Sequence, residues 1–209
     1  MPSQENVRVR GILHAEEALR KFTLHRRYPP SELEPYVEHY WLVRWDLRGQ
    51  EPHTQKVLSF PSVHLTFESD DGRRFSGVYG VLKKTFTRQL YNEGFTLGVK
   101  FRPGGFYPFL RSPLSRLTGK VLPTETVFGE AGAAVVRDVF AADGDEAMVR
   151  AAERFLLAHL PERDANVGRV RAIVEEAAAD RSIVKVAQLS ERFGISVRAL
   201  QRLFDRYVG

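Results

Sequence analysis

The side chains of this chain best suited to recognition chemistry lie near its C-terminus, at Arg198, Gln201 and Arg202. Their spacing of three and four residues places them on one face of a helix. From such a face, arginine can pair with two acceptors of guanine, and glutamine with the donor and acceptor of adenine, in the major groove of DNA. The alternative is an ordinary solvated face, because Arg and Gln also favour helices at exposed positions. The neighbouring elements must decide between these interpretations.

The residues before this face have the order of a helix-turn-helix. The stretch 166–180 carries apolar residues at helical spacing and predicts a first helix, with Asn166 available as its cap. "VKVAQLSERF" (184–193) predicts a second helix, Gly194 suits a left-handed turn, and Ser196 can cap the last helix. This combination favours DNA reading over a plain surface helix.

The same arrangement predicts contacts beside the bases. Arg198, Gln201 and Arg202 are the expected base-contacting residues, and Lys185, Ser196 and Arg206 the expected phosphate-contacting ones. The opposite face of the last helix is apolar and should point inward; it consists of Leu200, Leu203, Phe204 and Tyr207.

The segment "VAQLSERFGISVRALQRLFDRYVG" resembles the first helix-turn-helix of the AraC/XylS family of bacterial transcription regulators. The resemblance implies that Arg198, Gln201 and Arg202 read bases. Lys185 departs from it, since a Ser or Asp often caps that helix in the family. The sequence printed here ends before a second helix-turn-helix, so we expect weak DNA binding unless a dimer supplies a second half-site.

The first part of the chain predicts strands. Six short stretches rich in Val, Phe, Tyr, Trp and Thr occupy about 36–102, and helical spacing follows over about 104–160. We therefore expect an α+β fold: a β-rich sandwich or open barrel with a helical connector in residues 1–160, then a three-helix unit in 161–209. Residues 36–47 and 98–129, with "FRPGG", are similar to the sensor domain of an uncharacterised AraC-like branch.

Composition excludes several classes of chemistry. The chain of 209 residues contains no cysteine, carries a net charge of +5 and has no apolar run long enough to span a membrane, so we expect a cytoplasmic protein. No hydrolase, nucleotide-binding or dehydrogenase fingerprint occurs, so we expect no catalytic residues, no cofactor and no enzyme. Between residues 81 and 120, eight basic residues face a single acid, Glu93; such a stretch is usually a solvated surface and less often flanks DNA.

Metal sites are not expected either. The six histidines, including His14, are scattered along the chain. His64 is the one histidine that we expect to share a strand face with a carboxylate, that of Glu68. A hydrogen-bonded core histidine is the favoured interpretation of His64, and a cupin-like metal site is the alternative.

Several aromatic residues of the first part are candidates for an effector pocket, although aromatic side chains on strands more often form the core. The candidates are Tyr40, Trp41, Trp45, His64, Phe101, Arg102 and Phe106. In "FRPGGF", Gly104 and Gly105 could also offer backbone N–H groups to an anion beside Arg102, but a strand-to-helix corner is favoured.

The sequence therefore predicts an AraC-like transcription regulator that binds double-stranded DNA, with a small-molecule effector and a homodimer as open partners. The alternative is a module that binds a small molecule or a protein and whose helix-turn-helix only packs. DNA binding that is steeply salt-dependent would distinguish the first from the second.

Overall fold

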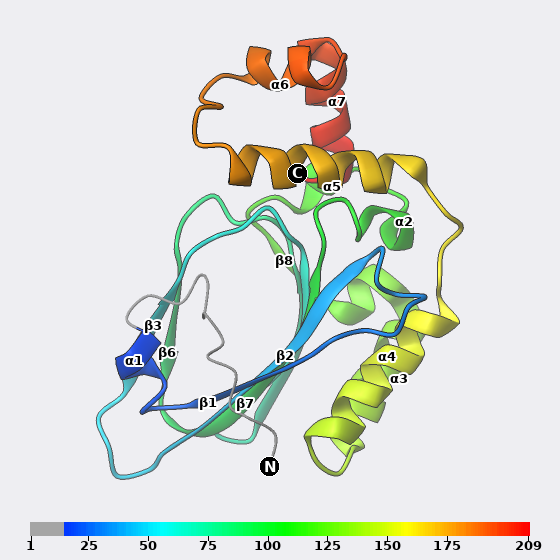
Figure 1. The fold of residues 1–209 in the computed structure, drawn as a ribbon. Coiled ribbons are helices and arrows are strands. Elements are labelled where there is room, and N and C mark those ends of the chain that lie inside the picture. The colour runs from blue at the N-terminus through cyan, green and yellow to red at the C-terminus, as the bar shows by residue number, and fades with distance from the viewer. Residues whose placement is uncertain (1–14) are drawn as a thin grey trace, which may run out of the picture.

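The computed structural model describes residues 15–209 and contains a strand-rich part followed by helices (Figure 1). The first part has a short helix α1 (Ala15–Ala18) and eight strands. The strands are β1 (Thr23–Arg27), β2 (Val37–Leu47), β3 (His53–Val57), β4 (His64–Asp70), β5 (Arg73–Tyr79), β6 (Phe86–Leu90), β7 (Asn92–Phe101) and β8 (Val121–Pro123). The helices are α2 (Tyr107–Leu110), the 3-10 helix η1 (Leu114–Leu117), α3 (Thr124–Ala141), α4 (Asp145–Ala158), α5 (Ala165–Ala179), α6 (Val186–Arg192) and α7 (Val197–Tyr207).

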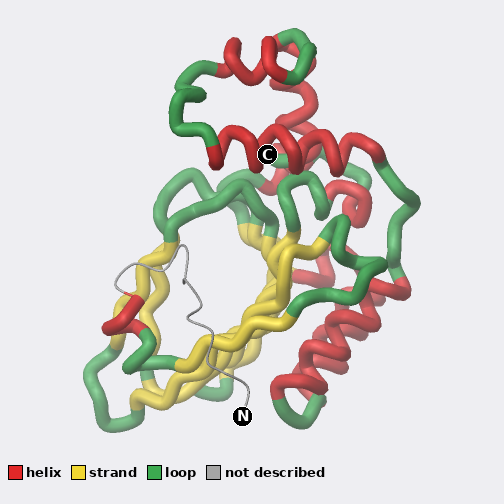
Figure 2. The backbone as a smooth tube through the Cα atoms, viewed as in Figure 1, coloured by secondary structure: helices red, strands yellow, loops and turns green. Residues whose placement is uncertain are grey.

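The strands form one large and one small antiparallel sheet. The six-stranded sheet has the order β1-β2-β7-β4-β5-β8, and β3 pairs with β6 in a separate two-stranded ribbon. In Figure 2 the ribbon stands opposite the large sheet, as in an open barrel. This arrangement confirms the predicted α+β class, with antiparallel sheets first and helices after them.

The helices α3 and α4 cover the other face of the large sheet (Figure 1). Alternate residues of the central strands point toward them, because successive side chains of a strand lie on opposite faces. Phe67 of β4 is fully buried, and its ring contacts that of Phe140 in α3 at a centroid distance of 6.3 Å. This layer is the main core of the molecule.

The three-helix unit α5–α7 lies at one end of the sheet and shares this core. Val167, Val170 and Val174 of α5 belong to the same buried cluster as Phe101 and Phe106. The cluster is therefore continuous across residue 161, where we expected one domain to end, and the division at that point stays a prediction. Among the described residues, no helix combines the length and apolar character needed to cross a membrane.

Three details differ from the sequence-based expectation. The edge strand β1 and the three-residue β8 were not expected. Helix α3 begins at Thr124 and is kinked at the non-helical residue Gly129 (φ 59°), whereas the pattern of "GEAGAAVVRDVFAA" (129–142) predicts a helix that begins only at this glycine. The cap of α5 is Asp164, whose carboxylate accepts from the Asn166 amide at 2.9 Å; the interpretation of Asn166 as the cap was therefore wrong.

The turn after β7 generates a test of packing. A Cβ at Gly105 would lie 2.3 Å from the carbonyl oxygen of Tyr36, so Gly105→Ala forces backbone apart. We expect a loss of about 1–3 kcal/mol in the free energy of unfolding, measured by urea denaturation.

The control for this substitution is Gly168→Ala in α5, where the added methyl group meets nothing within 4 Å. There we expect a gain of about 0.5–1 kcal/mol, because alanine loses less conformational freedom in a helix than glycine does. Equal stability of the two variants would contradict the close approach at Gly105.

Candidate nucleic-acid interface

The turn between α6 and α7 is fixed by its small residues. Gly194 adopts φ 60°, the left-handed conformation that ends α6. The Ser190 hydroxyl donates to the carbonyl oxygen of Ile195, which ties the second helix to the far side of the turn. The hydroxyl of Ser196 then accepts a hydrogen bond from the Ala199 amide at 3.2 Å and caps α7. The predicted turn and cap are thus present.

The start of α6 is closed by a residue that the sequence did not single out. The side-chain oxygen of Gln188 accepts hydrogen bonds from the amides of Val184 and Lys185, at 2.9 and 2.8 Å. These contacts bind the amide of the N-cap residue itself, as the Gln or Glu of a capping box does, and they order the chain just before α6. Lys185 is exposed at this helix start.

The polar and apolar faces of α7 separate as expected. Arg198, Gln201 and Arg202 are exposed, whereas Leu200 and Tyr207 are buried. Leu203 and Phe204 are partly buried and pack against the main core. The three residues predicted to contact bases therefore share one accessible face.

Charged contacts hold the helices of the unit together. The Arg192 guanidinium at the end of α6 contacts two carboxylates of α5, those of Glu176 and Asp180, the second at 2.9 Å. Because these side chains are partly exposed, we expect each ion pair to contribute little to stability and mainly to orient the helices.

The last turn of α7 is bound to the strand-rich part. The rings of Tyr207 and Tyr107 lie 4.2 Å apart, and the Tyr207 hydroxyl donates to Asp164 at 2.6 Å. Burial and this hydrogen bond raise the pKa of Tyr207 to about 12. Arg206 lies over the Tyr107 ring at 5.0 Å and donates from Nε to the Tyr107 hydroxyl. Arg206, a predicted phosphate contact, thus has a protein partner here, while Lys185 and Ser196 lie at the starts of α6 and α7.

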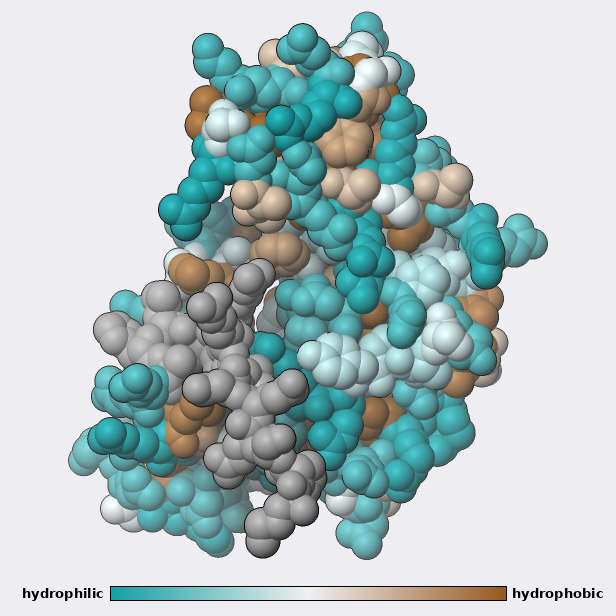
Figure 3. All heavy atoms as spheres, viewed as in Figure 1, coloured by the Kyte–Doolittle hydropathy of each residue, from teal (hydrophilic) through white to brown (hydrophobic). Residues whose placement is uncertain are grey.

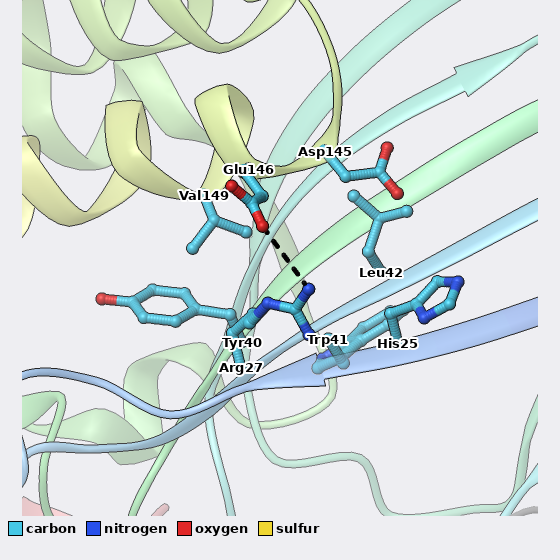
Figure 4. A pocket seen from close by; sticks show the side chains of 8 residues that line it. All are labelled: His25, Arg27, Tyr40, Trp41, Leu42, Asp145, Glu146 and Val149. Carbon is cyan, nitrogen blue, oxygen red and sulfur yellow. Dashed lines mark ion pairs between the residues drawn. The ribbon is translucent and has the colours of Figure 1, made fainter. Parts of the chain in front are cut away.

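Two of the candidate effector residues, Tyr40 and Trp41, line a cleft of about 120 Å³ between β1, β2 and the start of α4. Figure 4 shows Arg27 and Glu146 facing each other across it, and their ion pair measures 3.7 Å. Ligand pockets commonly measure roughly 300–1,000 Å³, so this cleft suits only a small ligand.

The other candidate effector residues lie elsewhere. Phe101 and Phe106 pack edge to face in the core at 4.8 Å. Arg102 and Phe106 line a small hollow beneath Tyr207 and Val208, where the strand-rich part meets the helical unit. The backbone amide of Gly105 donates to the Arg102 carbonyl, and Gly104 adopts φ 81°, as a strand-to-helix corner requires.

His64 and Trp45 lie on the sheet face opposite α3 and α4. His64 accepts a hydrogen bond from Trp41 Nε1 at 3.3 Å, as a core histidine does. Within residues 15–209, no group of three His, Asp or Glu side chains could hold a metal ion; His14 lies outside the described residues.

The sequence missed a polar cluster on this same face. The Arg88 guanidinium on β6 contacts Glu68 at 2.6 Å and Asp70 at 2.7 Å, and it lies 5.3 Å from the Trp45 ring. The Tyr79 hydroxyl also donates to Glu68, at 2.9 Å. The cluster connects the two-stranded ribbon to the large sheet. The one sequence signal for this cluster was the alternation in "HLTFE", which places Glu68 on this face of the strand.

The burial of His64 generates a prediction about pH. Burial and, secondarily, the charges of Lys100 and His39 lower its pKa from 6.5 to about 3. The folded state therefore keeps His64 neutral where the unfolded chain binds a proton. The resulting stability is complete above pH 6.5 and is lost as the pH falls toward 3. Between pH 6.5 and 4.5, wild type should lose up to about 1.4 kcal/mol per pH unit relative to His64→Gln.

Chemical denaturation at several pH values measures this difference, with His25→Gln at an exposed histidine as the control for the substitution. Glu38, which both proteins retain, titrates below this window. Burial opposes its ionisation, but hydrogen bonds and charges from His39 and Lys100 hold its pKa at about 2, so its contribution is lost only below 4.5. Parallel stability curves for wild type and His64→Gln would contradict a neutral His64 in the folded state.

Comparison with known proteins gives a match for the strand-rich part. Residues 25–123 match the family model of a domain of unknown function, DUF6597, and this stretch runs from β1 to the end of β8. No curated protein matches the chain. Among solved structures, the crystal structure of the AraC-like transcriptional activator CuxR is similar over 87% of this chain and 79% of that chain, with 16% identity and a TM-score of 0.28. A TM-score this low supports no conclusion about this chain.

Proposed function

We propose that this protein is a DNA-binding transcription regulator whose helix α7 reads bases in the major groove. The observation that supports the proposal is the shared exposed face of Arg198, Gln201 and Arg202 on a helix that is capped by Ser196 and preceded by the Gly194 turn. Arginine and glutamine on such a face match the donors and acceptors of guanine and adenine.

The proposed contacts to the backbone come from both helices of the motif. Ser196 and Lys185 lie at the N-termini of α7 and α6, where free amides and the helix dipole favour a phosphate. Arg206 can contribute only if its side chain leaves Tyr107 or bridges the ring and a phosphate. One helix-turn-helix buries about 600–1,000 Å² on DNA, so contact with a second half-site would raise the affinity.

The strand-rich part would then sense an effector, and the cleft beside Tyr40 and Trp41 is the candidate site. Its charged residues include Arg27 of β1 and Glu146 of α4, which form an ion pair, so a small polar ligand would alter the contact between sheet and helix. The proposal includes a homodimer as the source of a second half-site and assigns a catalytic role to no residue.

The test is fluorescence anisotropy with duplex DNA from the region upstream of the gene, over a salt series. We expect Arg202→Ala to weaken binding to the preferred duplex by about 1–3 kcal/mol, since one bidentate base contact is lost, while binding to a scrambled duplex changes less. Arg154→Ala is the matched control, because Arg154 is exposed on α4, outside the helical unit.

Binding of all three proteins to both duplexes with equal affinity would contradict base reading by α7. Absence of salt-dependent binding in the wild-type protein would favour the alternative, a ligand-binding or partner-binding module whose helix-turn-helix only packs.

A further inference from the structure

Five exposed basic residues lie beside the base of the helical unit, in a part of the chain without acids. Residues 72–92 and 94–124 contain no Asp or Glu. We call the following exposed residues of these stretches the basic surface: Lys83, Lys84, Arg111, Arg116 and Lys120. Among the described residues, none of the five has a carboxylate within ion-pair distance, whereas Arg88 and Lys100 in the same stretches are paired.

Backbone hydrogen bonds join the segments that carry the basic surface. The Gly119 amide donates to the carbonyl oxygen of Val81 at 2.9 Å, and the Gly80 amide donates to the carbonyl oxygen of Lys120 at 3.0 Å. The loop before β6, with its two lysines, therefore lies beside the loop that follows η1. Before the start of η1, Arg111 ends α2, and its backbone amide donates to the carbonyl oxygen of Tyr107 at 2.7 Å. The basic surface is thus one region that flanks η1.

This region adjoins the exposed face of α7. Arg198, Arg202 and Arg206 follow one another at intervals of four residues, so they lie along one side of the helix. The last of them stacks on Tyr107, one helical turn before Arg111. Asp205 is the one acid of α7. A row of basic side chains therefore continues from the candidate base-reading face onto the strand-rich part.

The dimensions of the helix suit contact with both bases and backbone. From Arg198 to Arg206 the helix rises about 12 Å, at roughly 1.5 Å per residue. The major groove of B-DNA is also about 12 Å wide. If the first turns of α7 reach the base edges, its last turn lies near the rim of the groove, where the phosphates are. The basic surface begins at that last turn.

We propose that the basic surface binds the phosphate backbone of the same duplex that receives α7. This inference rests on the proposed function. Exposed cations without ion pairs can contact phosphates without first breaking an ion pair, and each phosphate that they neutralise releases condensed counterions. The contact supplies backbone affinity that a single helix-turn-helix lacks, and it uses residues far from the motif in sequence.

The test compares two triple variants of equal net charge in the full chain. The first is Arg111→Gln/Arg116→Gln/Lys120→Gln. The control, Lys56→Gln/Arg137→Gln/Arg154→Gln, removes three exposed charges on β3, α3 and α4. Anisotropy with the upstream duplex between 50 and 200 mM salt gives the slope of log K against log salt. We expect the slope of the first variant to be smaller than that of wild type by about 2.7, or about 0.9 for each lost phosphate contact.

A slope difference of this size means that the affinity of wild type falls roughly 40-fold more than that of the variant over this salt range. The preference for the upstream duplex over a scrambled one should persist in the variant. Equal slopes for both triple variants would overturn the proposal, whether both are reduced or neither is. If Arg202→Ala still loses the sequence preference in that case, the proposed function survives without the basic surface.

Two further outcomes are decisive. Absence of DNA binding by the wild-type protein would overturn the proposed function and this inference together. A parallel titration with vesicles that contain phosphatidylglycerol tests a different anionic partner. Vesicle binding that the first variant loses, with an unchanged slope on DNA, would overturn the DNA contact in favour of a membrane surface.

Discussion

The close packing of the α5–α7 unit against the corner between β7 and α2 determines where the candidate DNA contacts of α6 and α7 lie. At this corner, a Cβ at Gly104 would lie 3.2 Å from the Val170 side chain, and the residue has φ +81°, so glycine favours the close approach of α5. A Cβ at Gly105 would lie still closer, 2.3 Å, to the carbonyl oxygen of Tyr36. The corner then leads into α2, which presents Tyr107 to Tyr207. The two glycines therefore set the path of the chain on which α5 and the end of α7 pack.

This packing gives the two halves of α7 different surroundings. Its last turn is held by Tyr107, by Asp164 and by burial of Val208, whereas its first turn projects away from the sheet. The helix is thus fixed at one end and accessible at the other. The orientation of a reading face relative to the strand-rich part then depends on a few contacts, and any change at the corner would move α7 as a unit.

The segment between α4 and α5 offers a physical route from the candidate effector cleft to α7. The cleft includes the first turn of α4, and the chain that leaves this helix contacts the sheet through the Tyr36 hydroxyl, which donates to the Pro161 carbonyl at 3.4 Å. Asp164 follows, where it caps α5 and accepts from Tyr207. A displacement of α4 would therefore move Asp164, which contacts both the start of α5 and the end of α7. Coupling between the sites also requires a second stable arrangement of these elements.

Local pattern predicted the elements that depend on neighbours in sequence. Periodicity predicts the central strands and the inward face of α7. Capping chemistry predicts that α6 ends at Gly194 and that Ser196 caps the start of α7. The sequence did not predict the short edge strands, because neither has an apolar run. Strand β1 is basic and largely exposed, and β8 has only three residues. Contacts between distant segments, such as Arg88 with Glu68, leave almost no sequence signal.

Arg202 and Arg206 show where prediction from pattern ends. They are the same residue type, four residues apart on one helix face, and the sequence assigns both to DNA. The structure distinguishes them through Tyr107, which lies 99 positions away from Arg206 in the chain. The guanidinium group of Arg206 stacks on the Tyr107 ring and donates to its hydroxyl. Any phosphate contact by Arg206 must therefore compete with an aromatic ring and a hydroxyl, whereas Arg202 remains exposed and without a recorded protein partner in the described part of the chain. Helical periodicity can place two side chains on one face, but only the packing of the unit against α2 determines which of them is available.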